Sequence, residues 1–149
     1  MAGGVLTLYN HVAERIGDGG FDMDTNTFNI VLLSSSYTPD LSHTTYSDIS
    51  ANEIATANGY TAGGAALTGV TWAQTGGVAT FDSADQIWTA SGGSITARYA
   101  ALRQVSPDLL LGYFLLDTAP ADVTATDGNT LTVGPDAVNG WFKQTVNPV

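Results

Sequence analysis

Cysteine is absent from the 149 residues, so the chain has neither a disulfide framework nor a thiolate site for metal binding or catalysis. Positive charge is almost as scarce. Four Lys and Arg residues stand against 14 Asp and Glu residues, which leaves a net charge of −10. Nucleic acids and anionic membrane surfaces bind through cationic groups, so we expect neither as a partner of this chain.

Long apolar runs are also missing. The longest one, LLLGYFLL at 109–116, is far too short to span a bilayer. The first residues, MAGGVLTLYNH, lack the basic stretch and long apolar stretch of a secretory signal. We therefore expect a soluble protein without a visible export signal, and one domain is the usual outcome for this length.

What the chain does have is an apolar fraction of 44% with only 12% charged residues, and 17 glycines. Leu8, Val12 and Ile16 recur at a spacing of four, which predicts one short helix over 7–17 with Thr7 as its cap. The rest of the chain shows short alternating or apolar segments separated by turn-forming residues, which is typical of β-strands.

The strand-like segments follow one another at short intervals. FNIVLLSS and LLLGYFLLD predict buried strands, SITARYAALRQV alternates as one strand over 94–105, and GWFKQTV predicts a closing edge strand. Thr75-Gly76 and Asp127-Gly128 each lie between two such segments and predict hairpins. We predict a mainly β fold, a single-domain antiparallel β-sandwich or barrel with one short N-terminal helix. Its arm and helix would occupy 1–19 and its β-sandwich 20–149.

Metal binding has one candidate motif. Asp22, Asp24 and Asn26 open like a calcium loop, but Thr27 stands where the loop needs Gly and Leu33 where it needs a bidentate Glu. A polar turn is the better interpretation, although a different calcium site built from loop Asp residues stays open. The two histidines, His11 and His43, do not have zinc-ligand spacing.

Catalytic motifs are equally hard to find, because no G-x-S-x-G segment or phosphate-binding loop is present. Pairs of loop carboxylates could act as in a glycoside hydrolase, but turn capping is the more common role of such Asp residues. We predict that the chain is not an enzyme and needs no cofactor.

The long loop at 35–48 and the N-terminal segment 1–9 are the best candidates for protein contacts, because long loops are often functional. Trp72 and Trp88 are expected in the core, although Tyr37, Tyr46 and Trp88 could instead form a sugar- or receptor-binding platform. Arg98 lies within an alternating strand, and we expect it to pair with Asp82 or Asp85 and to matter more for stability than Arg15. The candidate contact residues are Leu6, Tyr9, Tyr37, Pro39, His43 and Tyr46.

Four segments together resemble a known family. In order they are SSYTP at 35–39, GYTAGG at 59–64, FDSADQIW at 81–88 and ITARYA at 95–100. As a set they are similar to small virion proteins encoded near the head genes of tailed bacteriophages, over roughly residues 5–117. The segment from GPDAVNGWFKQTV onward departs from that pattern.

This resemblance implies a virion structural role and suggests a capsid decoration, or cement, protein on the outer surface of the phage head. A tail or connector protein and a head-fibre component are the alternatives that it leaves open. The expected partners are the major capsid protein and further copies of the chain. A trimer would suit the local three-fold positions of a shell.

Overall fold

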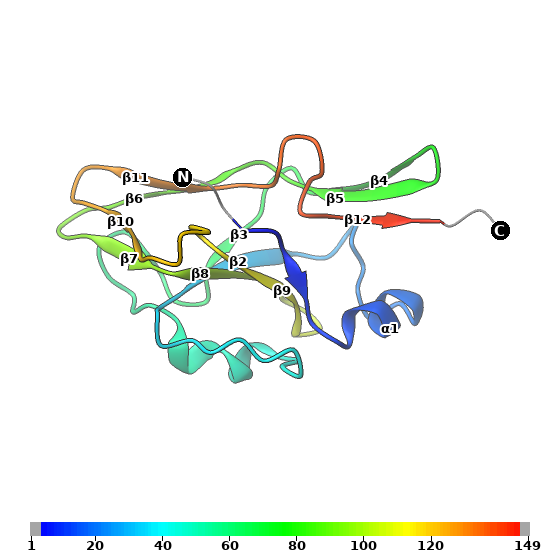
Figure 1. The fold of residues 1–149 in the computed structure, drawn as a ribbon, viewed down its shortest axis with the longest axis horizontal. Coiled ribbons are helices and arrows are strands. Elements are labelled where there is room, and N and C mark those ends of the chain that lie inside the picture. Colours follow the sequence, from blue (N-terminus) through cyan, green and yellow to red (C-terminus); the bar gives the residue numbers. More distant parts are fainter. Residues whose placement is uncertain (1–3, 147–149) are drawn as a thin grey trace.

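The computed structural model describes residues 4–146, which form two packed layers of antiparallel strands with one short helix (Figure 1). The predicted mainly β, sandwich-like fold is therefore confirmed. Among the described residues, no helix is long and apolar enough to cross a membrane.

The first layer is a five-stranded sheet in the order β1-β9-β8-β2-β3. Its three long strands pair over most of their length, and the apolar run at 109–116 supplies β9 as predicted. The strand bounds are Thr7–Leu8 for β1, Phe28–Leu33 for β2, Ala65–Ala66 for β3, Tyr99–Gln104 for β8 and Leu109–Leu115 for β9.

The second layer lies above the first in Figure 1 and consists of two groups of strands. β12 and β4 flank β5, and β11 pairs with β6; a further pair, β10 and β7, continues from the first layer at one end. The bounds are Thr71–Thr75 for β4, Val78–Asp82 for β5, Gln86–Thr89 for β6, Ile95–Ala97 for β7, Val123–Ala125 for β10, Thr130–Val133 for β11 and Phe142–Thr145 for β12.

Two predicted features of the second layer are confirmed. β4 and β5 form the expected hairpin, and Gly76 and Gly77 at its turn have φ of 59° and 82°, which favours glycine at both positions. β12 is an edge strand, because it pairs only with β5.

The predicted helix over 7–17 is too long. Thr7 and Leu8 form β1 against Tyr113 and Gly112, and the helix α1 spans only Val12–Gly17. Leu8 therefore belongs to the sheet, and Thr7 is not a helix cap. Residues 4–8 run along β9 instead of forming a separate arm, while 1–3 lie outside the described residues.

The predicted single strand over 94–105 breaks at Arg98. The backbone N–H of Arg98 donates to Leu33 and its carbonyl accepts from Leu116, so the chain kinks between β7 and β8. Beyond the kink, 100–102 are all buried, because β8 is covered on both faces. The alternation seen in the sequence therefore stops at Arg98.

The predicted hairpin at Asp127-Gly128 is wrong, because the two strands that flank this turn do not pair with each other. The turn exists, and Gly128 has φ of 81°, but the strands on its two sides pair with different partners. β10 pairs with β7, whereas β11 pairs with β6. The turn thus carries the chain from one layer to the other.

The core between the layers contains several aromatic side chains in contact. Phe28 of β2 meets Phe81 of β5 edge to face at 4.9 Å between ring centroids. Trp88 is buried as predicted, while Trp72 is half-buried and packs on Phe142 near the end of the second layer. The opposite face of the first layer is covered by α1 and by residues 34–53, which we name the covering loop (Figure 1).

Candidate protein-contact surfaces

The covering loop (34–53) seals the lower face of the five-stranded sheet. Tyr37 is only 3% exposed, and its ring lies 5.3 Å from that of Tyr99 and 5.9 Å from that of Tyr113. Its hydroxyl shares a hydrogen bond of 2.9 Å with the hydroxyl of Tyr9. Burial raises the pKa of both Tyr9 and Tyr37, so these two hydroxyls stay neutral at ordinary pH.

The prediction that Tyr9 and Tyr37 make surface contacts is therefore wrong, because both are core residues. Alternate residues of β9 face opposite sides of the sheet, and Tyr113 gives the loop an aromatic surface to pack on. Trp88 is buried as well, so Tyr37 and Trp88 cannot take part in the sugar-binding platform considered from the sequence.

The other predicted contacts are more accessible. Pro39 is exposed, whereas His43 and Tyr46 are half-buried. The ring of His43 lies 6.2 Å from Tyr9 and 6.1 Å from Tyr37, so it closes the tyrosine cluster from the loop side. Leu6, also half-buried, lies on the opposite side of the sheet and lines the cavity described below.

Glu53 fastens the end of the covering loop. Its carboxylate accepts hydrogen bonds from the hydroxyls of Tyr46 and Tyr60 and, at 2.8 Å, from the backbone N–H of Gly63. Burial, helped by the Glu53 carboxylate, raises the pKa of Tyr46 to about 12 and raises that of Tyr60 too. No sequence motif predicted this network, although Glu53 is one of only two glutamates in the chain.

Arg103 reinforces the same region from β8. Its guanidinium lies 4.1 Å from the centre of the Tyr46 ring and its Nη1 lies 3.0 Å from Asp108. Asp108 in turn accepts the backbone N–H of Tyr46. Nearer the middle of the loop, Asp48 accepts from the backbone N–H groups of Thr45 and Thr44, and these bonds lower its pKa. These contacts make the loop a fixed part of the fold.

The predicted ion pair of Arg98 with Asp82 or Asp85 is wrong. Arg98 Nε lies 2.8 Å from Asp122, which belongs to the connection that leaves β9. Asp82 instead accepts the backbone N–H of Ser83. The kink at Arg98 turns its side chain toward the first layer's own connection, and the alternating pattern gave no sign of that kink.

The D-x-D-x-N segment forms a polar turn. Asp22 accepts from the Thr25 hydroxyl and from the backbone N–H groups of Asp24 and Thr25, and these bonds lower its pKa. Across residues 4–146, no group of three or more His, Asp or Glu side chains is placed to hold a metal ion.

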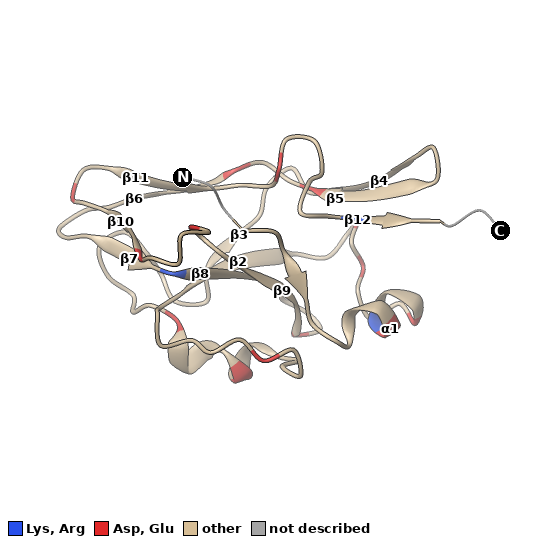
Figure 2. Cartoon of the chain, in the orientation of Figure 1, with Lys and Arg blue, Asp and Glu red and all other residues tan. Residues whose placement is uncertain are grey.

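The outward face of the second layer is nearly free of charge, and we name it the neutral face. Inward residues such as Phe81, Trp88 and Leu131 are buried, so their neighbours along each strand point to solvent. In Figure 2 the acidic residues lie mostly in the connections between strands. The neutral face consists of Thr71, Ala73, Thr75, Val78, Thr80, Asp82, Ile87, Thr89, Thr130, Thr132, Lys143 and Thr145.

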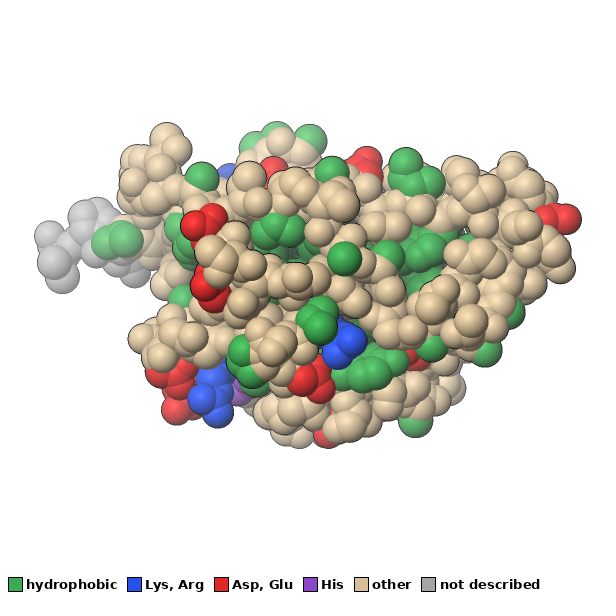
Figure 3. Space-filling view, turned by 180° about the vertical axis from the view of Figure 1, so that it is seen from behind, with side chains coloured by type: hydrophobic (Ala, Val, Ile, Leu, Met, Phe, Trp, Pro, Cys, Tyr) green, Lys and Arg blue, Asp and Glu red, His purple; other side chains and the backbone are tan. Residues whose placement is uncertain are grey.

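Figure 3 draws the side of the molecule opposite to the view of Figure 1, with its side chains. Figure 3 shows acidic side chains dispersed over that side, with broad neutral areas between them, and hydrophobic side chains visible between the two layers. The net charge is thus carried by separate loop carboxylates and not by a single acidic patch.

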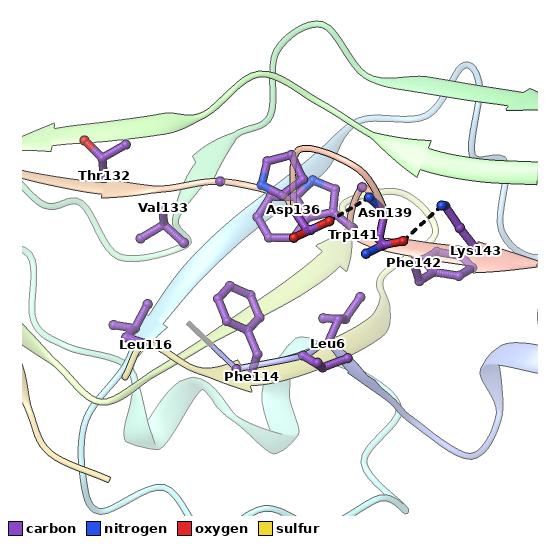
Figure 4. A pocket seen from close by; sticks show the side chains of 15 residues that line it. Leu6, Phe114, Leu116, Thr132, Val133, Asp136, Asn139, Trp141, Phe142 and Lys143 are labelled. Atoms are coloured by element: carbon purple, nitrogen blue, oxygen red, sulfur yellow. Dashed lines mark hydrogen bonds between the residues drawn. The ribbon is translucent and has the colours of Figure 1, made fainter. Parts of the chain in front are cut away.

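A cavity of about 620 Å³ opens between the layers beside β1, and we name it the groove (Figure 4). Leu6, Phe114 and Leu116 form its floor, and Phe114 points up toward Trp141, 5.7 Å away between ring centroids. Val133 lines the opposite wall. Its full lining is Gly4, Val5, Leu6, Phe114, Leu116, Thr132, Val133, Gly134, Pro135, Asp136, Asn139, Gly140, Trp141, Phe142 and Lys143.

The roof of the groove is a tight loop between β11 and β12. Asp136 accepts the backbone N–H groups of Val138 and Asn139, which lower its pKa, and Lys143 donates to the Asn139 side chain at 3.0 Å. Gly140, with φ of 62°, closes the loop where a side chain would collide with the Phe81 carbonyl. The sequence analysis did not single out any of these roof residues.

Comparison with known proteins gives no relative: no protein-family model matches the chain, and no curated protein or solved structure is significantly similar to it.

Proposed function

We propose that the protein is a structural component of a tailed-phage virion and that it decorates the outer surface of the head. The phage assignment is supported by the four sequence segments that resemble small head proteins. The part played by the chain in the assembly is supported by its surface, which offers areas for protein contact. The major capsid protein and other copies of the chain are the partners in this proposal.

The observation that carries the proposal is the contrast between the neutral face and the total charge. Of the twelve residues that make up this face, only Asp82 and Lys143 are charged, and their charges are opposite, in a chain of net charge −10. A flat strand face without net charge can dock on another protein without desolvating many ions. Packaged DNA would repel the acidic remainder, which favours the outside of the shell.

The hydrogen-bonding of the polar side chains also favours a structural role over a catalytic one. Glu53, Asp22, Asp48 and Asp136 each accept two or more hydrogen bonds from their own turn or network. Such bonds hold loops in place, which suits a rigid packing module. We therefore propose a function by contact and not by catalysis.

The first test is the copy number of the protein in purified virions, measured by quantitative mass spectrometry against the major capsid protein. A decoration protein is expected at a ratio comparable to that of the capsid protein. A small fraction of that ratio would move the protein to the tail, connector or fibre, and its absence would overturn the virion assignment.

The docking face can be tested on isolated shells. Thr89→Asp places a charge on the neutral face and should weaken attachment, because a carboxylate would be desolvated in the contact. Thr38→Asp, on the exposed part of the covering loop, adds the same charge elsewhere and should leave attachment unchanged. Equal attachment of both variants would contradict docking through the neutral face.

A further inference from the structure

The mouth of the groove carries unusually exposed apolar side chains. Val5, which lines the groove, is 89% exposed, and Val138, in the roof loop, is 78% exposed. These are the two most exposed large hydrophobic residues in the described part of the chain. Covering such an apolar hollow and its protruding valines with another apolar surface is favourable, because it removes apolar area from water.

The groove also has two charged side chains that do not form a salt bridge with each other. Arg15, Arg98 and Arg103 each lie within salt-bridge distance of a carboxylate. Within residues 4–146, Lys143 forms no such salt bridge, and it donates a hydrogen bond to the side-chain oxygen of Asn139. Asp136 lines the same cavity, and its two hydrogen bonds within the roof loop both use one oxygen, Oδ1. The groove thus presents one acid and one base that are not paired with each other.

Both strands at the upper rim are open edges. β11 pairs only with β6, and β12 pairs only with β5, so the sides of these strands that face the groove have no neighbouring strand among the described residues. Unpaired strand edges are frequent places of association between chains. The apolar floor, the unpaired strand edges and the two charged side chains therefore all lie on the same side of the sandwich, where they are free to contact another molecule.

We propose that the occupant of the groove is a second copy of this chain, packed groove to groove about a two-fold axis. Val5 of each copy enters the hollow of the other, against Leu6 and Phe114. Lys143 of each copy pairs with the partner's Asp136.

The combination of features favours a second copy over an unrelated protein. A two-fold contact uses the same patch twice, so the patch must contain both members of each interaction. The groove does so, because it has a hollow and a protruding valine, and an acid and a base. It is also neutral in a chain of net charge −10, so two copies can approach there with the least repulsion.

The pairing does not depend on the virion assignment. Thr132 and Lys143 belong to both the groove and the neutral face, so pairing would cover that margin of each neutral face. If the proposed function also holds, a pair would attach to a shell by the remainder of two neutral faces, which strengthens binding through effective concentration. The trimer expected from shell geometry is a different arrangement, in which hollow and protrusion would lie on separate surfaces.

The test is the solution mass of the purified chain by sedimentation over a wide range of concentration. The mass should rise from the monomer value of 15.4 kDa to twice that value. Val5→Asp should weaken the pairing by at least about tenfold, because a carboxylate would enter the apolar hollow. Thr38→Asp, at an exposed residue of the covering loop, adds the same charge away from the groove and should leave pairing unchanged.

Folding of each variant is checked by circular dichroism, and Val5 is exposed enough for its replacement to leave the fold intact. A third variant, Lys143→Glu, should also weaken the pair by placing like charges together across the axis. A monomer at every concentration, a three-chain mass, or equal pairing by Val5→Asp and Thr38→Asp would overturn the proposal. None of these results bears on the copy number in virions, so the two proposals fail separately.

Discussion

The two sides of β9 are covered in different ways. Tyr113 faces a side that the covering loop seals with Tyr37 and Tyr9, whereas its neighbour Phe114 faces the groove, which is open to solvent. The sealed side is held by buried aromatic contacts and by the hydrogen bonds of Glu53. A long loop can therefore be a structural cover, and in our proposal the surface left for partners lies where such a cover is missing.

The largest effect is expected from removing the centre of the sealed side. Tyr37→Ala should lower the free energy of unfolding by about 3–5 kcal/mol, because it leaves a cavity among Tyr9, Tyr99 and Tyr113. Thr38→Ala, at the exposed neighbouring residue, should change it by less than about 0.5 kcal/mol. Urea denaturation measures both, and a small loss for Tyr37→Ala would show that the loop is not a true cover.

Glu53 lies on the sealed side and Asp136 lies on the open side, and each accepts hydrogen bonds that hold a loop. Removing each acceptor in turn therefore compares the two sides. Glu53→Ala leaves the hydroxyls of Tyr46 and Tyr60 and the Gly63 N–H without their acceptor and should cost about 3 kcal/mol. Asp136→Ala also removes an acceptor of two N–H groups, but water can replace it at the exposed roof loop. Its cost should be under about 1 kcal/mol, and equal costs in thermal denaturation would remove the distinction.

Alkaline pH should act on the sealed side, since no tyrosine lines the groove. The folded-state pKa of Tyr46 is raised from 10.0 to about 12, so its contribution is complete below pH 10.0 and is lost as the pH rises through about 12. The raised pKa values of Tyr9, Tyr37 and Tyr60 act in the same direction. Urea denaturation across this range should show falling stability, with a shallower fall for Tyr46→Phe; a constant stability would contradict the burial of these hydroxyls.

Small effects are expected for the arginines. Arg103→Ala should cost about 1–2 kcal/mol, because it removes both the Asp108 pair and the contact with the Tyr46 ring. Arg98→Ala, in a half-exposed pair with Asp122, should cost under about 1 kcal/mol, and Arg15→Ala, in a more exposed pair with Asp18, should cost least. If Arg15→Ala lowered the melting temperature most and Arg103→Ala least, solvent exposure would not determine how much each ion pair contributes to stability.

Local sequence patterns predicted the long strands and one hairpin, but they missed several short strands and most of the strand partners. The hairpin at Gly76-Gly77 followed from residues adjacent in the chain, and so did the buried run that became β9. The turn at Asp127-Gly128 has the same local signature, yet the choice of β6 and β7 as partners depends on packing between segments far apart. Local sequence patterns do not show which of several distant strands a given strand will pair with.

The candidate contacts show the same limit. The turn-forming residues of 35–48 predicted a loop, and the loop exists, but its burial depends on Tyr99 and Tyr113 from distant strands. Leu6 was singled out and does line the groove, whereas the roof residues were not recognised because they lie in an ordinary polar turn. Only the assembled layers bring residues 4–6, 114–116 and 132–143 to one cavity.

The claim that the open side and not the sealed side meets other molecules is tested most directly by hydrogen exchange at low and at high protein concentration. We expect added protection at high concentration in residues 4–8 and 130–143, around the groove, with no change in the covering loop. Added protection in 34–53, with the groove residues unchanged, would contradict it.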